Sequence, residues 1–369
     1  MGLKLKKNHF FVECIIFFTL VLSSCNSVKN KTWSGDFILN EKYSEEADQV
    51  DLYLNANNFQ GAILVGKKDV IIFAKGYGVC DKNSDILRPV TINTTFEIGS
   101  ITKQMTAASI MQLVEKKKIK LNDKISKYFP DYVHGEEITV EMLLNMRSGL
   151  CDHINAADDF FPSNVYRNIE KNQLACRPLE DNLVLNYFYD APLIANPDST
   201  YFYSNTNYYL LAKIIEQVSG KSWYDYLRDN IFKPCGMRYS NLEFQNTDCK
   251  GYDYKDRYYS LPSELSFGCG DVNSCVTDLF KWNVQLVNGK VVSKKSLKKM
   301  LSTESYGYGI YRRGDSVFHA GTTNVFNAYD AYFFDDGLSV IVLSNTPVSK
   351  CNATFIAGKI IKIYKNSNK

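Results

Sequence analysis

The chain has 369 residues, of which 45% are apolar and 22% are charged, a composition typical of a globular protein with a large core. Its 43 basic and 40 acidic residues give a net charge of +3. Because no dense basic stripe interleaved with aromatic residues occurs, the charge gives no reason to expect a nucleic-acid partner.

The first 24 residues are typical of an export signal. Three lysines precede a charge-free apolar run over residues 14–22, which is shorter than the roughly 20 residues that a spanning helix needs. The run ends in Leu22-Ser23-Ser24-Cys25, which resembles the lipobox of bacterial lipoproteins. We therefore expect residues 1–24 to be a signal peptide, and lipid on Cys25 to hold the exported protein in a membrane of the bacterial cell envelope. The alternative is an ordinary cleavable signal with an incidental cysteine.

Residues 25–44 are rich in Asn, Lys and Ser and are predicted to form a polar tether, with ordered structure from about Glu45. Eight more cysteines follow, and none forms a Cys-x-x-Cys pair, so their spacing does not indicate a metal site. Disulfides are compatible with an exported protein, but the sequence does not give their connectivity. The closest pair is Cys269 with Cys275.

The ordered part opens with a predicted hairpin. The apolar runs 62–65 and 70–73 flank a polar turn and are enriched in β-branched residues. A strand-like segment, 95–98, then ends at Gly99. The first of several predicted helices follows it, over 101–116, 140–146, 207–218 and 222–229.

Ser100 and Lys103 lie at the start of the first of these helices. A serine there is near the positive end of the helix dipole, and a lysine three residues later returns to the same face. The pair is therefore a candidate nucleophile with its activating amine. The structural alternative is a serine N-cap with a solvated lysine. A second Ser-x-x-Lys, Ser296 to Lys299, lies in a lysine-rich stretch that is typical of a surface.

Tyr203 and Asn205 form one of five Tyr-x-Asn patterns. Tyr239-Ser-Asn241 is the main competitor, but Tyr203 follows a turn-rich segment and leads directly into a helix, which is a rigid platform for a phenol. A tyrosine with a pKa of about 10 can act as a base only if a cation such as that of Lys103 favours the phenolate, or if the two share a proton. The alternative is a tyrosine packed at the edge of a loop.

His319, Gly321 and Thr322 follow an apolar pair and precede a second predicted hairpin, formed by residues 326–334 and 338–343 around an Asp-Gly turn. We expect this pattern on an exposed strand edge, whose backbone N–H groups can bind a substrate that the glycine allows to approach closely. A lone histidine is more often structural than catalytic. A helix is predicted over 353–364.

Strands at both ends of the chain with helices between them predict an α/β fold. One mainly antiparallel sheet is built from both chain ends and has helices on its faces, and the helical insert forms a second lobe. We expect the sheet lobe to cover residues 45–99 and 265–369, and the helical lobe to cover residues 100–264. A ligand site is expected between them.

Together these patterns resemble the serine β-lactamase and penicillin-binding protein superfamily, specifically its class C β-lactamase and D,D-carboxypeptidase-like branch. The likeness covers about residues 46–365. It includes Phe96-Glu-Ile-Gly-Ser-Ile-Thr-Lys103, Ser148-Gly-Leu150 and Pro234-Cys-Gly-Met237 in this order.

By this resemblance Ser100 would be the acylated nucleophile, Lys103 its proton acceptor or electrostatic partner, and Tyr203 a general base. Asn205 would orient Lys103 and the substrate amide. The backbone N–H groups of Ser100 and Thr322 would bind the oxyanion. His319, next to Gly321 in the substrate-binding strand, would stand where many β-lactamases have lysine, and it is a less dependable anchor for a carboxylate because it can be neutral near pH 7.

The sequence therefore predicts a serine hydrolase that forms an acyl-enzyme with an amide or ester of the cell envelope, foremost a D-alanyl peptide. Its substrate partners would be a small peptide, an ester or a β-lactam. The alternatives are an esterase or a β-lactamase, and, in another class, a weakly catalytic penicillin-binding or sensory module. No metal or organic cofactor is implied. An α/β-hydrolase is disfavoured because no Gly-x-Ser-x-Gly elbow occurs.

Overall fold

The computed structural model describes residues 36–155, 182–242, 247–252, 263–323, 325–347 and 351–366. Its main sheet has the order β1-β3-β2-β9-β8-β7-β6, and every neighbouring pair in it is antiparallel. The strands are β1 (Phe37–Leu39), β2 (Gly61–Lys67), β3 (Val70–Tyr77), β6 (Tyr311–Arg313), β7 (Ser316–Thr322), β8 (Asn327–Phe333) and β9 (Leu338–Ser344). A two-stranded sheet pairs β4 (Phe96–Glu97) with β5 (Asn273–Ser274).

The sheet joins the two ends of the chain, because β2 pairs with β9 along its whole length, from Gly61 opposite Ser344 to Lys67 opposite Leu338. Both predicted hairpins form, and Gly337 adopts the positive φ of 69° in the turn between β8 and β9. The predicted α/β class with a mainly antiparallel sheet from both chain ends is confirmed.

Ordered structure begins earlier than Glu45. Strand β1 lies inside the segment 25–44 that we predicted as a polar tether, and it adds an edge to the sheet beside β3. A 3-10 turn, η1 (Glu41–Tyr43), connects it to the first helix. The three residues of β1 are apolar within a polar segment, and so short a run gives a weak strand signal until a neighbouring strand is available to pair with it.

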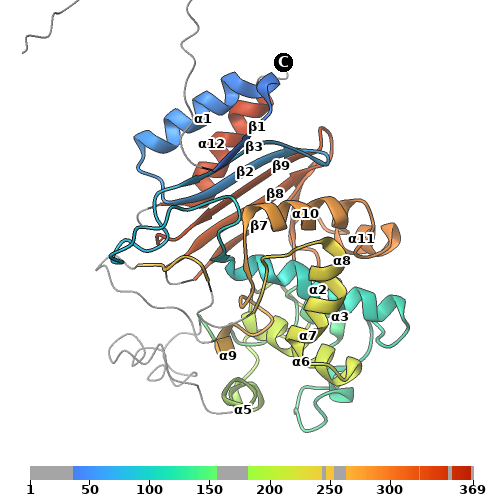
Figure 1. The fold of residues 1–369 in the computed structure, drawn as a ribbon. Helices are drawn as coiled ribbons and strands as arrows, with labels where there is room; N and C mark the ends of the chain where they lie inside the picture. The colour runs from blue at the N-terminus through green and yellow to red at the C-terminus, as the bar shows by residue number, and fades with distance from the viewer. Residues whose placement is uncertain are drawn as a thin grey trace, which may run out of the picture. The chain divides into compact units, whose positions relative to one another are not determined.

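Helices cover both faces of the sheet. Figure 1 shows α1 (Ser44–Ala56) and α12 (Ala353–Asn366) together on one face, and α10 (Val276–Val287) with α11 (Lys294–Met300) on the opposite side. In the described ranges, no helix has the length and apolar character needed to cross a membrane.

The remaining helices come from the middle of the sequence, between the strands of the two chain ends. Helix α2 (Thr102–Glu115) is almost wholly buried and contacts α6 (Asn205–Ser219), and both contribute residues to the apolar core. The other elements are η2 (Gly99–Ile101), η3 (Ile125–Lys127), α3 (Val140–Leu144), α5 (Leu183–Asp190), α7 (Trp223–Leu227), the π-helix η5 (Arg228–Phe232), α8 (Lys233–Cys235) and α9 (Ser263–Ser266).

The cysteines in the described ranges are free thiols, and most are buried. The closest pair in sequence, Cys269 and Cys275, is not bonded in this structure. Cys176 lies outside the described residues, as do Cys25 and the predicted signal peptide.

Candidate active site

Ser100 lies in the 3-10 turn η2, which runs directly into α2. Its Oγ is 2.9 Å from Lys103 Nζ and 2.9 Å from the hydroxyl of Tyr203. Three residues that the sequence singled out therefore meet at one oxygen, although Tyr203 is 103 positions from Ser100.

Lys103 is fully buried, and its amine has three neighbours. Besides Ser100 Oγ, Nζ lies 2.7 Å from Asn205 Oδ1 and 2.7 Å from the backbone oxygen of Cys269. Burial lowers the pKa of Lys103 to about 8, against the opposing effect of nearby negative charge. An amine with that pKa is partly neutral near physiological pH.

Tyr203 precedes α6, and its hydroxyl donates to Ser100 Oγ. Its ring lies 5.0 Å from Lys103 Nζ. Burial raises the pKa of Tyr203 well above its ordinary value, so the phenol keeps its proton in the resting site.

Asn205 begins α6 and turns its two amide ends in different directions. Oδ1 accepts from Lys103, and Nδ2 donates to both oxygens of Asp152 at 3.1 and 3.0 Å. Asp152 belongs to none of the motifs identified in the sequence. It lies two residues beyond the Ser148-Gly-Leu150 motif, and only the fold brings that loop behind α6.

Two glycines allow β7 to approach η2. A Cβ on Gly321 would lie 1.8 Å from the carbonyl oxygen of Ile98 and 3.2 Å from Ser100 N. A Cβ on Gly99, whose φ is 51°, would lie 2.8 Å from Thr322 N. The backbones of Ser100 and Thr322 therefore approach each other at the edge of the same cavity, where two N–H donors can stabilise an oxyanion.

The His319–Thr322 part of β7 extends beyond its partner β6, which pairs with β7 only from Ser316 to Phe318. His319 is 2% exposed and does not line the cavity, whereas Ala320 and Thr322 do. Its Nδ1 is 2.6 Å from the backbone oxygen of Ala320, and its Nε2 is 3.4 Å from the hydroxyl of Tyr306. Burial, with the nearby charge of Lys103, lowers the pKa of His319 to about 3.

A cavity of about 300 Å³ opens over Ser100. Tyr203, Asn205 and Thr322 line it together with the loop residues Ile154 and Asn155 and the Ser266–Gly270 turn. Ser100, Tyr203 and the end of β7 therefore face a single space that can hold a small acyl group, and Lys103 lies buried behind them.

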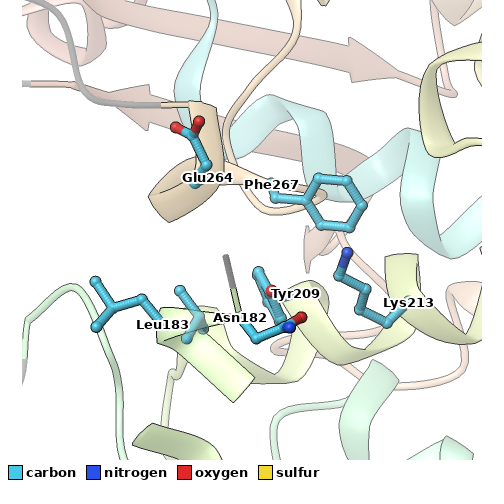
Figure 2. A pocket seen from close by; sticks show the side chains of 7 residues that line it. Asn182, Leu183, Tyr209, Lys213, Glu264 and Phe267 are labelled. Carbon is cyan, nitrogen blue, oxygen red and sulfur yellow. The ribbon is translucent and has the colours of Figure 1, made fainter. Parts of the chain in front are cut away.

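A second cavity has a volume of about 420 Å³ and is lined by residues of α5, α6 and α9 and by Phe267. Figure 2 shows Glu264 and Phe267 on one side of it and Asn182, Leu183, Tyr209 and Lys213 on the other. Lys213 Nζ is 4.3 Å from the ring centroid of Phe267 and 3.3 Å from Glu216 Oε2. This cavity contains none of the residues that the sequence singled out.

The two competing patterns lie elsewhere. Ser296 is in α11, and Lys299 forms an ion pair with Glu141 at 2.7 Å. Tyr239 is 45% exposed, and Asn241 pairs with the backbone of Asn273. Neither pattern contacts Ser100.

The chain is similar to known proteins in sequence and in fold. The β-lactamase family model matches residues 50–357. A protein of Bacillus subtilis (strain 168) named as the penicillin-binding protein PbpX is 29% identical over 316 residues, which are 82% of this chain and 75% of that protein. A teichoic acid D-alanine hydrolase of Staphylococcus aureus (strain MRSA252) is 29% identical over 278 residues, 71% of this chain and 65% of that protein.

Solved structures share the fold. A penicillin-binding protein homologue from Pyrococcus abyssi superposes with a TM-score of 0.73 at 27% identity, over 88% of this chain and 77% of that one.

Proposed function

This chain belongs to the β-lactamase family, and we propose that it is a serine hydrolase that acts through a covalent acyl-enzyme on a D-alanyl amide or ester of the cell envelope, with D,D-peptidase-like activity foremost. The observation that carries the proposal is the convergence of Lys103 and Tyr203 on Ser100 Oγ, each at 2.9 Å. The relatives named for penicillin binding and for teichoic acid D-alanine support the choice of acyl group.

The contacts of Lys103 favour it as the base. A neutral amine has two N–H bonds and one lone pair. Asn205 Oδ1 and the Cys269 carbonyl can only accept, so they take the two N–H bonds and leave the lone pair facing Ser100 Oγ. The hydroxyl of Ser100 then donates to Lys103 while it accepts from Tyr203.

Acylation proceeds from this arrangement. Ser100 Oγ attacks the substrate carbonyl, and its proton passes to Lys103. The negative oxygen binds to the backbone N–H groups of Ser100 and Thr322. The C–N or C–O bond then breaks, and the leaving group takes a proton from the Tyr203 hydroxyl, which recovers one from the Lys103 ammonium. Water then attacks the Ser100 ester by the reverse sequence of proton transfers, which releases the acid and restores the Ser100 hydroxyl.

An esterase is the second candidate, and His319 supports it. A neutral, buried imidazole supplies no positive charge to a carboxylate on the leaving group. A D,D-peptidase substrate has such a carboxylate, whereas a D-alanyl ester of a polyol does not.

The test is to incubate the protein and a Ser100→Ala variant with a labelled penicillin, a D-alanyl-D-alanine peptide and a D-alanyl ester. Mass spectrometry would measure the covalent adduct, and released D-alanine would measure turnover. A long-lived penicillin adduct with peptide cleavage supports the peptidase, and rapid adduct decay supports a β-lactamase. Ester turnover alone supports the esterase. No Ser100-dependent reaction with any of the three contradicts the proposal and leaves the weakly catalytic binding or sensory module.

We also propose that the protein is exported and anchored by lipid on Cys25, on the strength of the N-terminal sequence. Replacing Cys25 by Ser is expected to move the protein from the membrane fraction to the soluble fraction. Retention of the Cys25→Ser variant in the membrane would contradict lipidation at this residue.

A further inference from the structure

Asp152 is a buried carboxylate that, within the described ranges, accepts hydrogen bonds from N–H donors. Its Oδ1 accepts from the backbone N–H groups of Ile154 at 2.9 Å and Asn155 at 3.3 Å, and its Oδ2 accepts from Asn155 Nδ2 at 2.8 Å. The residue is 5% exposed. The loop that lines one side of the active-site cavity is therefore folded around this carboxylate.

The same carboxylate determines which way the amide of Asn205 points. A carboxylate only accepts hydrogen bonds, so Asn205 must present Nδ2 to it, and both Asp152 oxygens are within 3.1 Å of that nitrogen. Oδ1 of Asn205 then faces Lys103 Nζ at 2.7 Å. With the reverse orientation of the amide, an N–H group would face the amine, and the lone pair of Lys103 would no longer be reserved for Ser100.

Asp152 also contributes negative charge close to Lys103, opposing the effect of burial on the pKa of that amine. Most other titratable groups near Lys103 are neutral, unlike the Asp152 carboxylate. The pKa of His153 and of His319 is lowered by burial, and that of Tyr203 and of Tyr208 is raised by burial, so these groups favour their neutral forms. Burial raises the pKa of Asp271 to about 7 and that of Cys269 to about 12.

We propose that Asp152 is a positioning residue for the reaction, which orients Lys103 through Asn205 and supplies negative charge that favours its ammonium form. The inference rests on the proposed acyl-enzyme function. Hydrogen bonds connect Asp152 to Asn205, Asn205 to Lys103, and Lys103 to Ser100 Oγ, and each of them is 3.1 Å or shorter.

Replacing Asp152 by Asn is expected to have two separable effects. The amide of Asn205 loses its fixed orientation, so the maximal rate of Ser100 acylation falls about 10- to 100-fold, as is typical of a misplaced catalytic group. The loss of negative charge disfavours the Lys103 ammonium, so the pH at which acylation reaches half its maximal rate shifts downward from about 8.

The direction of this pH shift separates the proposal from a purely structural role. If the Asp152→Asn substitution only loosened the loop, water would reach Lys103, and its pKa would rise toward the ordinary value of 10.5. Asp152→Glu keeps the charge with a longer side chain and is expected to return the midpoint toward that of the wild type. Asp198→Asn removes an exposed carboxylate outside the cavity and serves as the matched control.

The experiment measures the rate at which a fluorophosphonate phosphonylates Ser100 in the purified protein between pH 5 and 10. This reaction releases fluoride and, like acylation, requires the proton of Ser100 Oγ to be removed. Circular dichroism and the unfolding midpoint check that each variant is folded. The proposal is supported if Asp152→Asn has a lower pH midpoint and a lower maximal labelling rate than the wild type, and Asp198→Asn has neither. An unchanged or upward midpoint overturns it. If neither the fluorophosphonate nor the penicillin, the peptide and the ester react at Ser100 of the wild-type protein, the acyl-enzyme function itself fails, which is a different result.

Discussion

Tyr306 and His319 of β7 are in hydrogen-bond contact, with 3.4 Å between the Tyr306 hydroxyl and His319 Nε2. Burial raises the pKa of Tyr306, so its hydroxyl stays the donor, and Nε2 accepts. Nδ1 then donates to the carbonyl of Ala320 at 2.6 Å. Both ring nitrogens are used by a neutral imidazole, which explains why this position does not act as a cation.

The first prediction concerns substrate choice. His319→Lys places a longer, cationic side chain on β7 next to the cavity-lining Ala320. It is expected to raise the preference for a substrate with a carboxylate on its leaving group about 3- to 10-fold, because a nearby opposite charge contributes about 1 kcal/mol. The measurement is the ratio of kcat/KM for a D-alanyl-D-alanine peptide and its C-terminal amide. His319→Gln, which adds no charge, is the control. An equal ratio in all three proteins would show that the residue at position 319 does not contribute to recognition of the substrate carboxylate.

The second prediction concerns the pH dependence of acylation. Since burial lowers the pKa of Lys103 to about 8, the neutral amine and the acylation rate should increase as the pH rises through 8. His319, with a pKa of about 3, adds no step between pH 5 and 8. Lys103→Met is expected to remove this limb and to lower the rate by about a thousandfold. If the acylation rate of Lys103→Met still rose with pH near pH 6, the assignment of Lys103 as the base would be contradicted.

A third prediction separates the roles of Tyr203 and Lys103. Because Tyr203 keeps its proton in the resting site, Tyr203→Phe removes a donor rather than the base. The rate with a D-alanyl amide should fall by a hundredfold or so, and the rate with an ester of an acidic phenol should fall far less, because a phenolate leaves without being protonated. Stopped-flow measurement of acylation with both substrates tests this. Equal losses would indicate that Tyr203 is needed for the attack itself.

A fourth prediction uses the close approach of β7 to η2. Gly321→Ala would bring a Cβ to 1.8 Å from the Ile98 carbonyl, so β7 must move away from Ser100 and the two N–H donors separate. Loss of one such donor typically costs a hundredfold or more in rate. Gly358→Ala is the control, because a Cβ there meets no atom within 4 Å and alanine favours a helix. Near-normal acylation by a folded Gly321→Ala variant would exclude β7 from the oxyanion site.

A fifth prediction concerns stability. Asp330 on β8 is buried beside Asn283 and Gln104, and burial raises its pKa from 3.8 to about 7. Between these values the folded state binds more protons than the unfolded state, so this group lowers the free energy of unfolding as the pH rises from 4 to 7. Asp330→Asn should therefore stabilise the protein at pH 8, by on the order of 1 kcal/mol, and have a smaller effect at pH 4. Urea unfolding of both proteins at pH 4 and pH 8 measures the difference in their free energy of unfolding. The prediction is contradicted if Asp330→Asn gains less stability over the wild type at pH 8 than at pH 4.

Much of the fold was predictable from local patterns. Alternating and β-branched runs with an Asp-Gly turn predict the hairpins at both ends, and apolar periodicity predicts α2, α6 and α12. The residues Ser100, Lys103, Tyr203 and Asn205 were identified by motif order and flanking sequence. Strand β1 was missed because three apolar residues in a polar segment have little local preference without a partner strand.

By itself, therefore, the sequence determined the kinds of element and the set of chemically active side chains, because both depend on residue type and short-range spacing. Only the tertiary structure decided how those side chains act. Asp152 became part of the site because the loop after Leu150 packs behind α6, 53 positions away. Burial, which no local pattern reports, keeps Tyr203 protonated, weakens the basicity of Lys103 and leaves His319 neutral. The energy of a charge depends on the atoms that surround it, and distant segments of the chain supply those atoms.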